Sequence, residues 1–157
     1  MPLPRRAHGW LAAAATLYLT GLSVVLLWPV HVDGEGGLIR FEALLGWLGS
    51  IGISSAVRYP LVESVANAVL FLPFGLLVAL AAERWHPVFR VVTAGLLALA
   101  FSIAAETAQG IYLPERTVDP RDVVANTAGA VVGALVPIVV VLARRMRVDR
   151  ARVGGPT

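Results

Sequence analysis

The sequence predicts an all-α integral membrane protein: a bundle of four transmembrane helices, with a further short helix at the outer membrane interface. Hydrophobic residues make up 57% of the 157 residues and charged residues only 15%, whereas an average soluble domain is about 45–50% apolar and about 25% charged. Four segments have the roughly 20 mostly apolar residues that a helix needs to cross a bilayer. The arginines are spread unevenly over the segments that connect these spans.

The expected spans are residues 9–30, 61–82, 88–108 and 123–142, which together form one membrane domain over 9–142. Residues 1–8 and 143–157 are the expected terminal tails, the second of them basic. The first apolar run ends in Leu27-Trp28-Pro29-Val30-His31 and lacks the small residues of a signal-peptide cleavage site. We therefore expect it to be retained as a membrane span.

The distribution of arginine predicts the orientation of the protein. All 13 basic residues are arginine. Nine of them lie before the first span, between the second and third, or after the fourth: Arg5, Arg6, Arg84, Arg90, Arg144, Arg145, Arg147, Arg150 and Arg152. By the positive-inside rule this side is cytoplasmic, so a multi-pass protein of the cell membrane with both termini in the cytoplasm is expected. The basic tail then faces anionic membrane lipids, and this distribution argues against nucleic acid as a partner.

The connection formed by residues 31–60 predicts the short outer helix. It carries apolar residues at helical spacing, namely Phe41, Leu44, Leu45 and Leu48. Glycines at 46, 49 and 52 weaken a long helix there. A short helix lying in the outer interface therefore fits better than a fifth span.

The ends of the later connections carry helix-start signals. Pro87 stands where the third span can begin, because the first turn of a helix tolerates the missing N–H of proline. Before the fourth span, Asp119 suits the N-cap, Pro120 the first helical position, and Asp122 the third position beside the positive helix end.

Polar side chains gather near the predicted outer face, which is informative because charged groups are costly inside a bilayer. Three pairs of these polar residues, at 63 and 67, 106 and 109, and 122 and 126, each share a helix face through their spacing of three or four residues. With Arg116 and Asp119 they form the candidate functional cluster: Glu63, Asn67, Glu106, Gln109, Arg116, Asp119, Asp122 and Asn126. We expect these residues to converge in space.

Several roles for this cluster remain open. The groups can hydrogen-bond across helices as packing contacts, helped by the small residues Gly129 and Gly133, and Ser102 is expected to be a packing serine. They can instead line a ligand-binding or catalytic pocket. Oxygen ligands also suit magnesium, calcium or manganese, whereas zinc is disfavoured because the three histidines lie outside the cluster and the chain has no cysteine. The sequence does not determine a cofactor or metal.

In this region the chain resembles the VanZ-like family, named for a protein linked to teicoplanin resistance. The resemblance covers about residues 63–142. It is carried by Asn67-Ala68-Val69-Leu70-Phe71-Leu72-Pro73-Phe74-Gly75, Glu106-Thr107-Ala108-Gln109, Arg116, Asp119, Asp122, Asn126, Gly129 and Gly133. The resemblance implies a helical membrane protein of the cell envelope with a part in glycopeptide or lipoglycopeptide resistance.

Three functions follow from these observations. In the first, the outward polar site binds a lipid-linked cell-wall component or the glycopeptide antibiotic, with membrane lipids as the surrounding partners. In the second, the protein is a membrane-embedded enzyme acting on an envelope lipid, with Glu106 and Asp122 as acid and base. In the third, it is a transporter or channel subunit, which would require an oligomer because four helices enclose little space.

Overall fold

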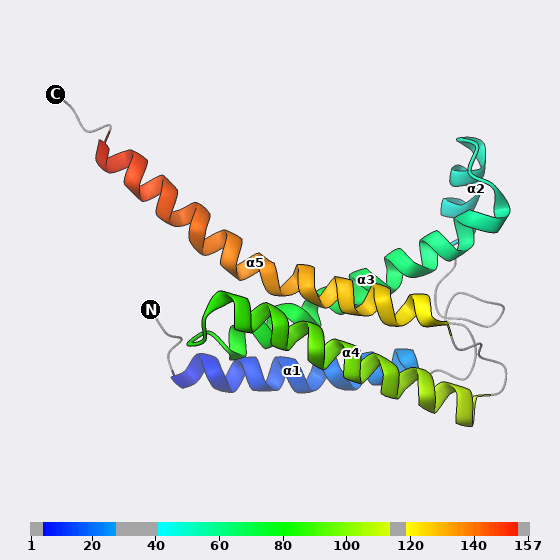
Figure 1. Cartoon of the computed structure of the whole chain (residues 1–157), viewed down its shortest axis with the longest axis horizontal. Helices are drawn as coiled ribbons and strands as arrows, with labels where there is room; N and C mark the ends of the chain where they lie inside the picture. The colour runs from blue at the N-terminus through cyan, green and yellow to red at the C-terminus, as the bar shows by residue number, and fades with distance from the viewer. Residues whose placement is uncertain (1–4, 28–40, 114–118, 154–157) are drawn as a thin grey trace.

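The computed structural model describes residues 5–27, 41–113 and 119–153, with side chains for 7–27, 41–113 and 119–147. All regular structure in these ranges is helical (Figure 1). The helices are α1 (Arg5–Leu26), α2 (Glu42–Ser50), α3 (Ser55–Ala81), α4 (Pro87–Tyr112) and α5 (Pro120–Val153). This confirms the predicted all-α class.

Four of the helices are long and apolar enough to cross a membrane. The candidate spans are Ala7–Leu26, Ser55–Ala81, Pro87–Tyr112 and Pro120–Arg147. The predicted number of spans is therefore confirmed. The short helix expected after the first span is present as α2, and its position at the membrane interface stays a prediction.

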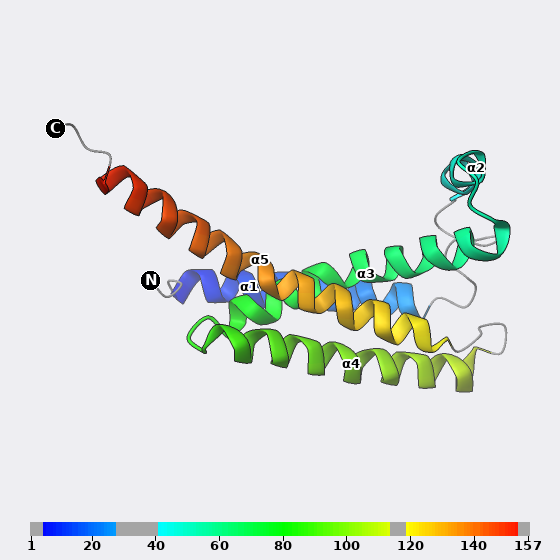
Figure 2. The same cartoon turned by 45° about the horizontal axis from the view of Figure 1, so that its top comes forward.

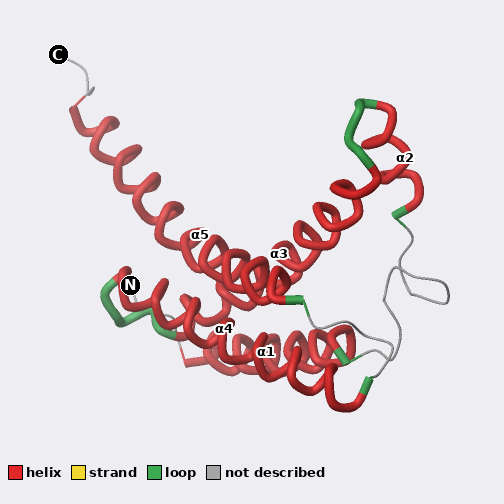
Figure 3. The backbone as a smooth tube through the Cα atoms, turned by 45° about the vertical axis from the view of Figure 1, so that its right-hand side comes forward, coloured by secondary structure: helices red, strands yellow, loops and turns green. Residues whose placement is uncertain are grey.

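Neighbouring spans alternate in direction. Helices α1 and α4 run one way and α3 and α5 run the other, so α1 begins and α5 ends at the same end of the bundle (Figures 1 and 2). At the opposite end, α4 ends near the beginning of α5, and α2 projects from the beginning of α3 (Figure 1). The beginning of α3 and the end of α5 splay away from the other helices (Figure 3).

Three glycines bring the backbones of α3 and α5 into direct contact, and these two helices form the most extensive helix pair. A Cβ atom at Gly129 would overlap the carbonyl oxygen of Ala68, and one at Gly133 that of Leu72. A Cβ atom at Gly75 on α3 would overlap the carbonyl oxygen of Ala130. Small residues allow this close approach. The resulting van der Waals packing holds the helices together in lipid, where no hydrophobic driving force acts between them.

Aromatic rings fill the centre of the bundle beside this contact. The rings of Phe71 and Phe74 on α3 pack on that of Phe101 on α4, with centroids 6.3 and 6.0 Å away. Leu22 and Leu26 of α1 are buried against the same cluster. The core therefore joins α1 and α4 to the α3–α5 pair.

Polar contacts close both ends of α3. At its start, Arg58 donates from Nη1 to the carbonyl oxygen of Leu45, which holds α2 beside α3 across a turn at Gly52 with φ of +92°. At its end, Arg90 of α4 donates from Nε to the carbonyl oxygen of Trp85, at 2.9 Å, and also to that of Glu83. These contacts fix α2 against the start of α3, and the connection between α3 and α4 against α4.

The helices extend beyond the expected bounds. Helix α3 begins at Ser55, not at 61, because Pro60 near its start forfeits a single backbone hydrogen bond, while the residues after it continue the helix. Helix α4 begins at Pro87 as predicted and continues to Tyr112, past 108. Helix α5 begins at Pro120 and continues to Val153, so much of the expected tail 143–157 is helical. Polar residues continue a helix outside the bilayer at little cost, and hydropathy therefore marks the span and not the helix end.

We predict that Gly129→Ala destabilises the protein by about 1–3 kcal/mol, the usual cost of overpacking a tight contact. Gly21→Ala is the matched control, because nothing lies within 4 Å of an added Cβ at that position. The measurement is the free energy of unfolding in mixed micelles. Equal stability of the two variants would contradict the close backbone contact.

Candidate functional site

Carboxylate, amide and guanidinium groups meet at the end of the bundle opposite the two termini. Helix α4 ends there with Glu106 and Gln109, and α5 begins there with Asp119 as its N-cap. Glu63 lies toward the beginning of α3 at the same end. The alternating helix directions thus bring residues far apart in sequence to one side of the membrane domain (Figure 1).

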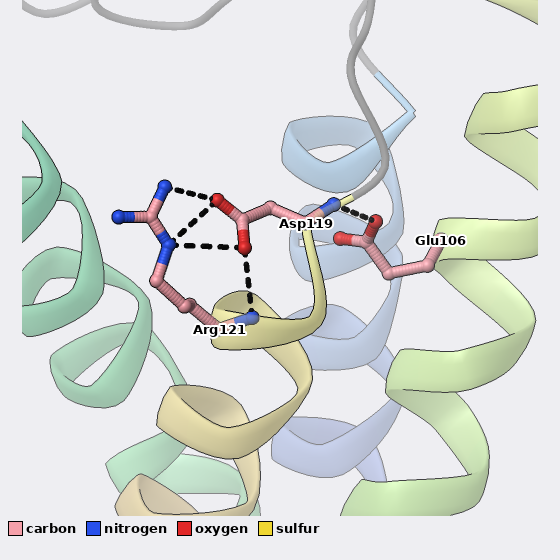
Figure 4. Close-up of polar contacts among 3 residues, drawn as sticks. All are labelled: Glu106, Asp119 and Arg121. Carbon is pink, nitrogen blue, oxygen red and sulfur yellow. Dashed lines mark hydrogen bonds and ion pairs between the residues drawn. The ribbon is translucent and has the colours of Figure 1, made fainter.

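Glu106 connects α4 to the beginning of α5. Its side chain is 8% exposed, and its Oε2 accepts a hydrogen bond from the backbone N–H of Asp119 at 3.1 Å (Figure 4). A buried carboxylate with a backbone donor fixes the position of the chain that supplies the donor. Glu106 therefore sets where α5 starts relative to α4.

Asp119 caps α5 and holds Arg121. Its Oδ1 accepts from the backbone N–H of Arg121 at 2.9 Å, which confirms the N-cap predicted from the sequence. Its carboxylate also receives hydrogen bonds from the Arg121 guanidinium, with Nε 2.8 Å from Oδ2 (Figure 4). The Arg121 side chain, and after it the Arg121 backbone N–H, lower the pKa of the Asp119 carboxyl below its ordinary value.

Arg121 is the centre of an exposed charged group. Its side chain is 59% exposed, and beyond Asp119 it interacts electrostatically with Glu63 of α3 and Asp122 of α5. We call Glu63, Asp119, Arg121 and Asp122 the polar rim. The carboxylates of the rim can accept hydrogen bonds from a ligand, and the guanidinium of Arg121 can donate them.

A second set of polar groups is buried beneath the rim and pairs within the protein. Asn126 of α5, 2% exposed, donates from Nδ2 to Oγ of Ser102 on α4 at 2.8 Å. Gln109 donates from Nε2 to the carbonyl oxygen of Leu26 on α1 at 2.6 Å. In the part of the chain that the structure describes, Oδ1 of Asn126 has no hydrogen-bond partner. These groups match the packing role weighed for the cluster, and Ser102 is a packing serine as expected.

The predicted cluster is therefore divided. Glu106 accepts a hydrogen bond from Asp119, and Glu63 and Asp122 interact electrostatically with Arg121, whereas Gln109 and Asn126 form hydrogen bonds with other residues. Asn67 is half-buried on α3. Arg116 lies outside the described residues. That these residues form a functional site stays a prediction.

Arg121 is the site residue that the sequence reasoning missed. It is not among the candidate residues, although its place two residues after a capping aspartate lets its side chain fold back onto that carboxylate. Tyr18 was also missed: its hydroxyl donates to the carbonyl oxygen of Leu70 at 2.6 Å and ties α1 to α3. No sequence signal identified that partner.

An open, mostly apolar groove of about 520 Å³ runs between α3 and α5 below the rim. Its lining residues are Ser64, Val65 and Ala68 on α3 and Pro120, Arg121, Val124 and Ala125 on α5. Arg121 thus belongs both to the polar rim and to the groove. Among the described residues, no group of three or more histidine, aspartate or glutamate side chains is placed to hold a metal ion.

A comparison with protein families gives one result that covers most of the chain. A family model described as VanZ/LLP1 matches residues 15–142. The chain belongs to the VanZ/LLP1 family. The match confirms the resemblance noted in the sequence, and it includes all of α2, α3 and α4, the second half of α1, and α5 as far as residue 142. No curated protein and no solved structure matches the chain.

We predict that the Ser102–Asn126 hydrogen bond stabilises this family member by about 0.5–2 kcal/mol, the range measured between membrane helices. In a double-mutant cycle, Ser102→Ala should lower the free energy of unfolding in the parent and lower it much less in the Asn126→Leu background. In that background no buried amide is left unpaired when the serine hydroxyl is removed. Thr107→Ala removes an exposed hydroxyl that bonds only within its own helix, and it serves as the control. The measurement is the free energy of unfolding. Additive effects of Ser102→Ala and Asn126→Leu would show that the bond is not formed.

Proposed function

We propose that this VanZ/LLP1 family protein binds a lipid-linked cell-wall component at the outer face of the cell membrane, and thereby contributes to resistance against glycopeptides such as teicoplanin. The observation that carries the proposal is the place of Arg121, which lines the apolar groove and belongs to the polar rim. A ligand with a polar head and an apolar chain needs both features in contact.

The rim has the chemistry to bind a sugar or peptide head group. Carboxylate oxygens of Asp119 and Asp122 accept hydrogen bonds from hydroxyl, amide and ammonium groups, and Arg121 donates to ligand oxygens. Hydrogen bonds to charged groups contribute about 1.5–3 kcal/mol each. The surrounding lipid is as apolar as the groove, so the groove selects a chain by shape and the rim supplies most of the specificity.

The orientation follows from the arginine distribution. The nine arginines beside the termini belong on the cytoplasmic side. The rim at the opposite end of the bundle then opens to the outer leaflet, the side from which a glycopeptide reaches the membrane. Binding a cell-wall component there withholds that component from the antibiotic. The antibiotic is the other candidate ligand for the same groove.

We predict that Arg121→Gln and Ala125→Phe each abolish most of the protection against teicoplanin. The first removes charge-assisted hydrogen bonds and lowers ligand affinity about tenfold or more, and the second fills the groove. Matched controls are Arg144→Gln, exposed on the distant part of α5, and Ala104→Phe, exposed on α4 and not among the residues that line the groove. The measurement is the inhibitory concentration in a sensitive host at equal membrane abundance.

Two results of this experiment would count against the proposal. If both Arg121→Gln and Ala125→Phe still protect the host, resistance does not depend on the rim and the groove. Absence of protection by the parent protein would remove the resistance role. Mass spectrometry of lipids purified with the parent, with and without added antibiotic, distinguishes a cell-wall lipid from the antibiotic as the ligand.

We predict that reporter domains fused after Arg152 and before Arg5 are cytoplasmic, because nine of the arginines gather at this side. A third fusion, placed between 114 and 118, should report the external compartment. The measurement uses paired reporters that are active on only one side of the membrane. External signals from both termini would show that the protein is inverted, with the polar rim toward the cytoplasm, and an external signal from one terminus alone would contradict the four-span topology.

A further inference from the structure

At the end of the bundle where α1 begins, an apolar groove of about 370 Å³ separates α1 from α3 and α4. Its volume is roughly a dozen times that of one liquid water molecule. The α1 wall is a single helix face, formed by Leu11, Ala12, Ala15 and Leu19, and Leu77 and Val78 of α3 lie opposite. The groove is shaped for an extended hydrocarbon chain.

A polar pocket of about 290 Å³ adjoins this groove. His8 and Ala81 line both, and Glu83, Arg84 and Trp85 complete the polar pocket. The apolar groove therefore has a charged pocket beside it, which we call its mouth. It lies at the opposite end of the bundle from the polar rim and is independent of the function proposed above.

The mouth contains groups of both signs. Glu83 is largely enclosed, with 15% of its side chain exposed, and its Oε1 lies 3.6 Å from Nε2 of His8. Arg84 is exposed at the edge of the pocket. Arg90 is already engaged with the carbonyl oxygens of Glu83 and Trp85. The pocket thus contains one carboxylate and one exposed guanidinium.

Aromatic residues indicate the depth of this mouth in the membrane. Trp10 on α1 and Trp85 in the α3–α4 connection are both largely exposed. Exposed tryptophan side chains concentrate at the level of the lipid head groups. The mouth with His8, Glu83 and Arg84 is therefore at head-group depth, and the apolar groove extends toward the bilayer centre.

We propose that this groove and its mouth bind a phospholipid with a zwitterionic, primary-ammonium head group, as in phosphatidylethanolamine. One acyl chain occupies the groove, Arg84 pairs with the phosphate, and Glu83 accepts hydrogen bonds from the ammonium. A phosphatidylglycerol head group has no cation for Glu83. The quaternary ammonium of phosphatidylcholine has no N–H to donate, so charge and hydrogen bonding together select the primary ammonium.

The test is native mass spectrometry of the purified full chain, titrated with the three phospholipids carrying identical acyl chains. The parent should bind phosphatidylethanolamine about tenfold more tightly than the other two, which corresponds to about 1.4 kcal/mol. Glu83→Gln should remove this preference without disturbing the apolar groove. Ala12→Trp should fill the groove and weaken all three lipids, whereas Ala13→Trp, exposed on the opposite face of α1, should bind as the parent does.

Three results would overturn the proposal. The first is equal binding of the three lipids by the parent. The second is a preference for phosphatidylethanolamine that persists in Glu83→Gln, because this substitution changes the head-group contact and not the groove. The third is equal binding by Ala12→Trp and Ala13→Trp, which would place the lipid elsewhere on the protein.

Discussion

The close backbone contact between α3 and α5 is the constraint on which the rest of the structure depends. Gly129 and Gly133 lie against carbonyl oxygens of α3, and Gly75 lies against one of α5, so any side chain at these positions would separate the helices. The contact fixes both the distance and the rotation of α5. Because of that rotation, Asn126 faces α4, while Val124 and Ala125 line the groove with α3.

The polar residues divide into a layer that joins helices and a rim that is open to a ligand. Ser102–Asn126, Gln109–Leu26 and Glu106–Asp119 connect α4 with α5 and α1, and each places a polar group against another protein group. Such bonds contribute about 0.6 kcal/mol on average between membrane helices. Their main effect is therefore geometric: they hold the start of α5 so that Asp119 presents Arg121 at the surface.

The sequence predicts features that depend on residues close together in the chain. It does not predict contacts that depend on how each helix is rotated in the bundle. The four spans, the start of α4 at Pro87 and the cap at Asp119 all follow from hydropathy and local hydrogen bonding. The division of the polar cluster into separate contacts could not be predicted in this way. The spacing shows that Glu106 and Gln109 share a helix face, but it does not show which helix that face contacts. Arg121 was not identified, because its charge indicates only that it belongs to the connection between the third and fourth spans. Its pairing with Asp119 depends on the backbone conformation at the N-cap.

The most direct test of this account is photocrosslinking in the membrane of living cells, without antibiotic. A photoreactive phenylalanine analogue is placed at Ala125, inside the groove beside Arg121, and separately at Ala104, exposed on α4 and not among the groove-lining residues. The account predicts that position 125 captures a lipid-linked cell-wall component, identified by mass, and that position 104 captures only bulk phospholipid. The same phospholipid adducts from both positions would contradict it.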